Sequence, residues 1–221
     1  FTKSELEKFV FLHTDGHEQY LSAYNAILSN QELQFLDHEK HRFTTNEMII
    51  VESNIVVMAE RANAAKLSES SFAERMAITK IEKSKTFNEE QKAAFRVLTN
   101  SSKVAIVNGA AGTGESYVLA AVNEAYKESG HHVIGAAIQG VTAQSMERDS
   151  GIESKTVASL LARLRWEQEN NVSPDQQTLK PNTILVLDEA GMIGSQDMHD
   201  ILKFSEMRGS KLRMVGDSFQ L

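Results

Sequence analysis

Val104-Ala-Ile-Val-Asn-Gly-Ala-Ala-Gly-Thr-Gly-Glu-Ser116 decides the fold, because a short apolar run is followed at once by a glycine-rich loop. Residues 117–125 then have a helical pattern, so strand, loop and helix are expected in the order of a phosphate-binding loop. In the pattern G-x-x-x-x-G-K-[ST], backbone N–H groups at the start of the helix hold phosphates, the lysine adds positive charge and the hydroxyl meets Mg²⁺. The stretch fits this pattern except at Glu115, which stands where the lysine belongs.

Eight consecutive residues are the candidate phosphate ligands, and the last of them is also a candidate Mg²⁺ ligand: Gly109, Ala110, Ala111, Gly112, Thr113, Gly114, Glu115 and Ser116. A carboxylate at position 115 would face a triphosphate, and at ~4 Å one such repulsion is about 1 kcal/mol in water and about 4 kcal/mol at an effective dielectric near 20. One alternative is a plain glycine-rich turn whose glutamate suits the helix dipole. A dinucleotide-binding fingerprint fits less well, because Tyr117 stands where its third small residue belongs.

The composition describes a globular chain with an acidic balance. Its 221 residues, 41% hydrophobic and 24% charged, are enough for one core or two small ones. No apolar run approaches the ~20 residues of a membrane span, so the cytoplasm is the expected location. The absence of cysteine excludes disulfides and thiolate chemistry, and the histidines lack metal-ligand spacing. A net charge of −7 argues against a broadly basic nucleic-acid binder, although a local groove can still be positive.

The chain is expected to have two parts, residues 1–86 and residues 87–221. The first part is predicted to be an all-helical unit without a strand, with helices over 4–12, 17–28, 45–62 and 69–78. In the second part helices and strands alternate, which is typical of an α/β fold with a parallel sheet and helices on both faces. The predicted strands are 104–107, 133–136, 184–187 and 212–215.

A pair of carboxylates, Asp188 and Glu189, follows the apolar strand 184–187. Sheets of this class place ligand-binding groups at such strand ends. Asp188 would hold Mg²⁺ through water, and Glu189 would orient or deprotonate the water that attacks a γ-phosphate. Gln220, after the last strand, would sense the γ-phosphate beside Glu189. The alternatives are a solvated acidic strand end and a polar loop.

Gln91 precedes the phosphate loop and is the candidate adenine ligand. Asn88-x-x-Gln91 is also a capping box, in which Asn88 caps the helix and Gln91 is its third residue. The two interpretations are compatible.

Four motifs in this order resemble those of superfamily 1 helicases of the RecD-like branch, namely residues 88–91, 109–116, 187–192 and 216–221. This resemblance implies a RecA-like P-loop domain that uses ATP and Mg²⁺. A metabolic P-loop kinase is disfavoured, because no acceptor-binding motif accompanies these motifs.

A narrower resemblance, carried by residues 41–48, 135–143 and 151–160, is to the helicase part of the TraA-type conjugative relaxases of Ti plasmids. It extends along the whole chain. It implies translocation on single-stranded DNA, driven by ATP hydrolysis in the complete protein, with other conjugation proteins as further partners.

The same resemblance implies that Gly140, Thr142, Lys155 and Thr156 lie near single-stranded DNA, where they would offer backbone, hydroxyl and cationic contacts to phosphates. The alternative for the last of these residues is a helix N-cap. Trp166 is either a base-stacking platform or a packing residue.

The chain departs from the helicase pattern in three ways. Glu115 replaces lysine, Val141 replaces a small or basic residue, and the chain is expected to stop before a second RecA-like domain, without which we expect no DNA unwinding. A catalytically silent remnant or DNA-binding module, with ATP and Mg²⁺ binding lost, is therefore the rival to a motor.

Overall fold

The computed structural model describes residues 1–37, 42–64, 71–109 and 114–216. The chain forms two compact units, Phe1–Asn54 and Ile55–Leu221. This division falls within helix α3 (Asn46–Ala64), whereas the sequence predicts a boundary at residue 86. Helix α4 (Phe72–Ser84) lies in the second unit because Ile81 joins the hydrophobic core beneath the sheet.

The first unit contains a pair of strands besides its helices α1 (Lys3–Leu12) and α2 (His17–Leu28). Strands β1 (Leu33–Asp37) and β2 (Arg42–Thr45) pair antiparallel, which corrects the prediction that residues 1–86 are all-helical. Phe43 of β2 is buried, with its ring centroid 4.5 Å from that of Phe35 and 5.9 Å from that of Phe1. This packing between residues distant in sequence leaves little trace in the local pattern of such short strands.

The second unit is built on a five-stranded parallel sheet in the order β3-β7-β6-β4-β5. The strands are β3 (Val104–Asn108), β4 (His132–Ala137), β5 (Glu153–Thr156), β6 (Thr183–Leu187) and β7 (Lys211–Gly216). The α/β class and the predicted strands are confirmed, and β5 is an addition. Its polar sequence Glu-Ser-Lys-Thr gives no strand signal by itself.

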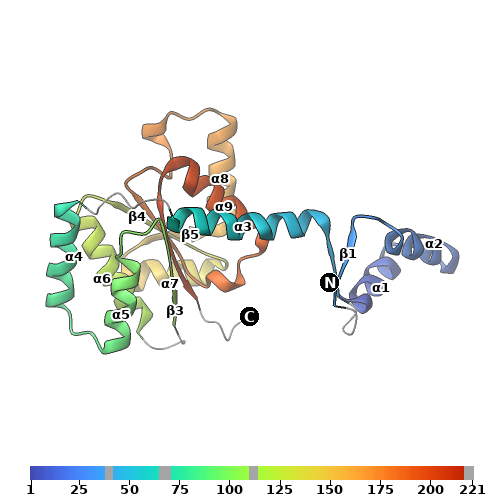
Figure 1. Ribbon diagram of the computed structural model, residues 1–221, viewed down its shortest axis with the longest axis horizontal. Coiled ribbons are helices and arrows are strands. Elements are labelled where there is room, and N and C mark those ends of the chain that lie inside the picture. The colour runs from blue at the N-terminus through green and yellow to red at the C-terminus, as the bar shows by residue number, and fades with distance from the viewer. Residues whose placement is uncertain (38–41, 65–70, 110–113, 217–221) are drawn as a thin grey trace. The chain divides into compact units, whose positions relative to one another are not determined.

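Helices cover both faces of this sheet (Figure 1). Besides α4, the unit contains helices α5 (Glu89–Leu98), α6 (Glu115–Glu128), α7 (Gly140–Ser150), α8 (Val157–Glu169) and α9 (Ser195–Arg208). Along β6, Ile184 and Val186 pack with α5, α6 and α7, while Leu185 and Leu187 pack with α8 and α9. A strand covered on both faces is apolar at nearly every position, and all five residues of β6, including Thr183, are buried.

Two basic residues of β7 lie inside the fold. Lys211 forms an ion pair with Glu74 of α4, with 2.6 Å between Nζ and Oε1. Burial lowers the pKa of Lys211, and the carboxylate of Glu74 opposes that shift. Lys211 and Arg213 alternate with Leu212 and Met214, which is the pattern of a half-exposed strand. The strand is nevertheless buried from Lys211 to Val215.

Arg213 is fully buried and binds the turn that follows α5. Its Nε donates to the carbonyl oxygen of Leu98 at 2.5 Å. Its two terminal nitrogens donate to the carbonyl oxygens of Ser102 at 3.0 Å and Asn100 at 2.9 Å. Tyr126 Oη lies 2.9 Å from Nη2, and Nη1 also donates to the carbonyl oxygen of Leu212 at 2.9 Å. The C-terminal end of a helix has carbonyl groups without partners and a negative dipole end, so it suits a cation.

Gly135 in β4 is expected to tolerate no side chain. A Cβ atom there would overlap Ser154 Oγ and lie 2.9 Å from Met146 Cε and 3.1 Å from Ile152 Cγ2. We expect Gly135→Ala to lower the free energy of unfolding by about 1–3 kcal/mol, measured by urea denaturation, because overpacking a core forces its neighbours apart. The control is Gly194→Ala, where nothing lies within 4 Å, and equal stability of the two variants would contradict this expectation.

Candidate nucleotide-binding site

Three segments that are far apart in the sequence meet at the carboxyl edge of the sheet. Gly109, after β3, donates its N–H to the carbonyl oxygen of Gly216, at the end of β7, at 3.0 Å. A Cβ atom on Gly216 would lie 3.3 Å from the backbone nitrogens of Ala190 and Gly191, which follow β6. Glycine at 216 therefore permits the close approach of the loops after β3, β6 and β7. These loops carry the predicted phosphate, metal and water-activating residues.

The glycine-rich loop lies between strand β3, which ends at Asn108, and helix α6, which begins at Glu115, in the predicted order. Gly114 adopts φ +86° and is the N-cap of α6, a conformation that favours glycine. Ser116 lies exposed in the first turn of α6, where backbone N–H groups have no partner within the helix. Four of the predicted ligands, Ala110, Ala111, Gly112 and Thr113, lie outside the described residues, as do Asp217 and Gln220.

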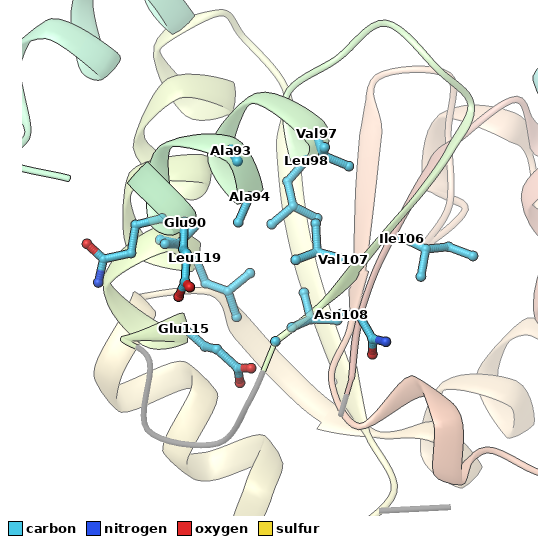
Figure 2. A pocket seen from close by; sticks show the side chains of 14 residues that line it. Glu90, Ala93, Ala94, Val97, Leu98, Ile106, Val107, Asn108, Glu115 and Leu119 are labelled. Carbon is cyan, nitrogen blue, oxygen red and sulfur yellow. The ribbon is translucent and has the colours of Figure 1, made fainter. Parts of the chain in front are cut away.

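Glu115 folds back across the loop. A Cβ atom built on Gly109 would overlap the carboxylate of Glu115. Figure 2 shows the side chain of Glu115 reaching from the start of α6 toward the end of β3 at Asn108. The negative charge therefore lies over the first glycine of the loop rather than pointing away from it. Its direction could not be predicted from the sequence.

Gln91 has the capping role and also lies against the loop. It accepts a hydrogen bond from the Asn88 N–H at 3.2 Å, and its own N–H donates to Asn88 Oδ1 at 2.8 Å. A Cβ atom on Gly114 would lie 2.5 Å from Gln91 Nε2. The capping box is confirmed, and it places the Gln91 amide beside the last glycine of the loop. Contact with adenine stays a prediction.

Asp188 and Glu189 are held at the end of β6. Asp188 Oδ1 accepts a hydrogen bond from the Glu189 N–H at 2.9 Å. Burial raises the pKa of Asp188; the adjacent Glu189 charge adds to this shift and the hydrogen bond opposes it. Glu189 has φ +51°, unusual for a side chain larger than glycine. Within the described ranges, its buried Oε2 has no hydrogen-bond partner.

These groups fit a hydrated cation better than they fit a triphosphate. The raised pKa of Asp188 and the buried Glu189 oxygen both indicate carboxylates that a positive charge would stabilise. No cluster of three or more carboxylate or histidine side chains is found among the described residues. In proteins Mg²⁺ usually keeps several water ligands beside one or two carboxylates. The carboxylate of Glu115 over Gly109 does not fit the γ-phosphate.

The residues predicted to contact DNA lie together at the carboxyl ends of β4 and β5. A Cβ atom on Gly140, in the first turn of α7, would lie 3.9 Å from Thr156 Cγ2. Lys155 and Thr156 belong to β5, and Thr142 is half-buried in α7. Thr156 also accepts a hydrogen bond from the Ser159 N–H at 3.2 Å, so its role as a helix cap is confirmed. DNA contact stays a prediction at all four residues.

Trp166 is not a core residue. Its side chain is about half exposed, and the Arg163 guanidinium lies 4.6 Å from its ring centroid.

Val141 is also exposed, at the start of α7. Among the described residues, no helix is both long and apolar enough to span a membrane.

Comparisons with known proteins agree with this geometry. A family profile described as "AAA domain" matches residues 86–221. The chain is 28% identical over 229 residues to conjugal transfer protein TraA of Rhizobium radiobacter and to TraA of Agrobacterium fabrum, matching 100% of this chain and 20% of each relative. It is 30% identical over 136 residues to multifunctional conjugation protein TraI of Escherichia coli K12, matching 59% of this chain and 8% of that protein. The chain thus spans about a fifth of the length of the TraA relatives, and the TraA-type resemblance is confirmed.

Proposed function

Because the chain belongs to the AAA domain family over residues 86–221, we propose that it is part of an ATP-dependent helicase or translocase that moves single-stranded DNA in conjugation. The observation that carries this proposal is the meeting of three motif loops at one sheet edge, with Gly109 bonded to Gly216 at 3.0 Å. A parallel sheet binds its ligands at this edge. Similarity to TraA and TraI, which are conjugation proteins by name, supports the conjugative role.

In this proposal residues 87–221 are the first RecA-like domain, and the family match from residue 86 supports that boundary. Mg²⁺, when bound with ATP, would neutralise phosphate charge. Ser116 and Asp188 would hold the hydrated ion from the loop and from the end of β6. Glu189 and Gln220 would orient the attacking water, and Gln91 would contact adenine.

A second function, a DNA-binding module without ATP turnover, is supported by one observation. The Glu115 carboxylate lies over Gly109, where it repels phosphate. The fold and the DNA-facing residues do not depend on the charge at position 115. Loss of ATP binding would therefore leave DNA affinity in place.

The test measures the affinity for fluorescein-labelled oligo(dT) at several salt concentrations, with fluorescence anisotropy as the readout. We expect Lys155→Glu to weaken binding about fivefold and to reduce the slope of log affinity against log salt by about one, because one phosphate contact is lost. Lys203→Glu, on the exposed surface of α9, makes the same charge change as a matched control. Absence of oligo(dT) binding by the parent chain, or equal losses in the two variants, would contradict the proposal. A response of this affinity to Mg-ATP would distinguish a motor from a silent binding module.

A further inference from the structure

Trp166 of α8 is the only tryptophan of the chain, and it is 47% exposed. Tryptophan is highly buried on average, so a half-exposed indole is more informative than an exposed leucine would be. The Arg163 guanidinium lies over this ring, 4.6 Å from its centroid. A flat aromatic surface and a positive charge therefore lie together at the surface of α8.

A buried carboxylate holds this arginine in place. Glu167 is fully buried and accepts hydrogen bonds from Arg163 Nε at 2.9 Å and from Thr178 Oγ1 at 2.5 Å. It also accepts one from Arg208 Nη1. Burial would raise the pKa of Glu167, but these hydrogen bonds lower it below its ordinary value, so the carboxylate is charged at neutral pH. Two guanidinium groups share this one carboxylate, which leaves one positive charge in excess in the cluster beside Trp166.

Arg163 and Trp166 continue a row of side chains that begins at a residue already proposed to contact DNA. The row starts at Thr156, the N-cap of α8, and its next members follow at intervals of three, four and three residues: Ser159, Arg163 and Trp166. Residues three and four apart are neighbours on a helix surface. At 1.5 Å per residue this α8 row is about 15 Å long. Glu169, one turn further along, has the opposite charge, so the row ends at Trp166.

The chemistry of the α8 row matches a nucleic-acid strand. Its hydroxyl groups and the Arg163 guanidinium suit phosphate oxygens, and the Trp166 indole suits a base. Stacking on an aromatic ring tolerates any base, because every base has a flat π-face. A duplex keeps its bases within the helical stack and offers none to an indole, so the row favours a single strand.

We propose that single-stranded DNA runs along the α8 row from Thr156, with one base stacked on Trp166 and a phosphate at Arg163. This inference rests on the proposed DNA-binding function and extends its DNA contacts from the sheet edge along α8. It adds two residues, Arg163 and Trp166, to those proposed to contact DNA.

The emission of Trp166 tests the stacking directly, because no other tryptophan contributes to it. On titration with oligo(dT) we expect the emission to fall and to saturate at the concentration at which the anisotropy saturates. A strand of equal length without bases should leave the emission unchanged. Constant emission while oligo(dT) binds would overturn this inference, leave the proposed function standing and make a protein contact the alternative for the indole. Absence of oligo(dT) binding would overturn both.

Substitution of the ring gives a second test. Trp166→Ala should weaken oligo(dT) binding about tenfold, as expected for the loss of one stacked base, whereas Trp166→Phe should stay within about threefold of the parent. Phe72→Ala, at a 71% exposed aromatic residue of α4, is the matched control and should leave the affinity unchanged. Equal affinities in the parent and in Trp166→Ala would contradict the stacking.

The phosphate contact is tested by the dependence of binding on salt. Arg163→Gln should reduce the slope of log affinity against log salt by about one, and Arg163→Lys should keep the slope. Arg165→Gln is the control, because its side chain is 50% exposed against 48% for Arg163. Side chains two residues apart on a helix do not face each other, so this control should keep the slope as well. Equal slopes in Arg163→Gln and Arg165→Gln would overturn the phosphate contact at Arg163.

Discussion

Glu115→Lys is expected to increase the affinity of this chain for Mg-ATP at least about 30-fold, measured by titration calorimetry at fixed salt and Mg²⁺. The Glu115 carboxylate lies over Gly109, so in the proposed site it would lie close to bound phosphates. The substitution removes one repulsion and adds one attraction, each worth about 1 kcal/mol in water and more where solvent is excluded. The described end of the loop needs no change, since Gly114 already starts α6 at φ +86°.

Two controls separate the contributions to this effect. Glu115→Gln removes the repulsion without adding a cation, and its affinity should lie between those of the parent and the lysine variant. Adding Asp188→Ala to Glu115→Lys should weaken the Mg²⁺-dependent part of the binding, because the carboxylate at the end of β6 would be lost. Equal ATP affinity in the parent and in Glu115→Lys would show that position 115 does not control the phosphate site.

Arg213→Met is expected to lower the free energy of unfolding by about 3 kcal/mol, because a fully buried guanidinium is replaced by a side chain that donates no hydrogen bond, and the part-buried carbonyl oxygens of Asn100 and Ser102 lose it as a donor. Arg213 bonds the carbonyl oxygens of Leu98, Asn100 and Ser102 and the hydroxyl of Tyr126. Methionine fills a similar volume but donates no hydrogen bond.

The measurement is urea unfolding with thermal denaturation, and a fall in Tm of about 6–12 °C corresponds to this loss in a protein of this size. Arg148→Met is the control, because the Arg148 side chain is 71% exposed and forms its ion pair with the adjacent Asp149 at the surface. Its effect should stay within about 0.5 kcal/mol, as for most surface ion pairs. An unchanged unfolding midpoint in Arg213→Met would show that the guanidinium's desolvation cost cancels its hydrogen bonds.

Short apolar strands followed by glycine or acidic residues were predictable, and so was the parallel sheet that they form. A strand buried on both faces is apolar at nearly every position, so a hydrophobic run such as residues 184–187 can be recognised from the sequence alone. The two short N-terminal strands were missed because their pairing holds one buried phenylalanine, Phe43, between Phe1 and Phe35. Strand β5 was missed because it is polar.

The candidate site was predicted residue by residue, but its assembly was not. Sequence spacing placed Gln91 in a capping box, because the partners of that box are three residues apart and their bonds are local. The contact between Gly109 and Gly216 lies at the ends of β3 and β7, which are far apart in the sequence. Only the order of strands in the sheet makes β3 and β7 neighbours. The same holds for Gly140 and Thr156.

The sequence by itself determined the fold class, the strand and glycine-rich loop with the pattern of a phosphate-binding loop, and the unusual charge at position 115, because each depends on neighbours along the chain. The tertiary structure alone decided that the Glu115 carboxylate turns over Gly109. It alone decided that Arg213 is buried, since the alternation in β7 indicates an exposed face. The carbonyl groups of Leu98, Asn100 and Ser102, which accept hydrogen bonds from this guanidinium, lie more than a hundred residues earlier, at and just after the end of α5. Hydrogen bonds between a buried charge and carbonyl groups so distant in the sequence leave no mark in the local sequence pattern.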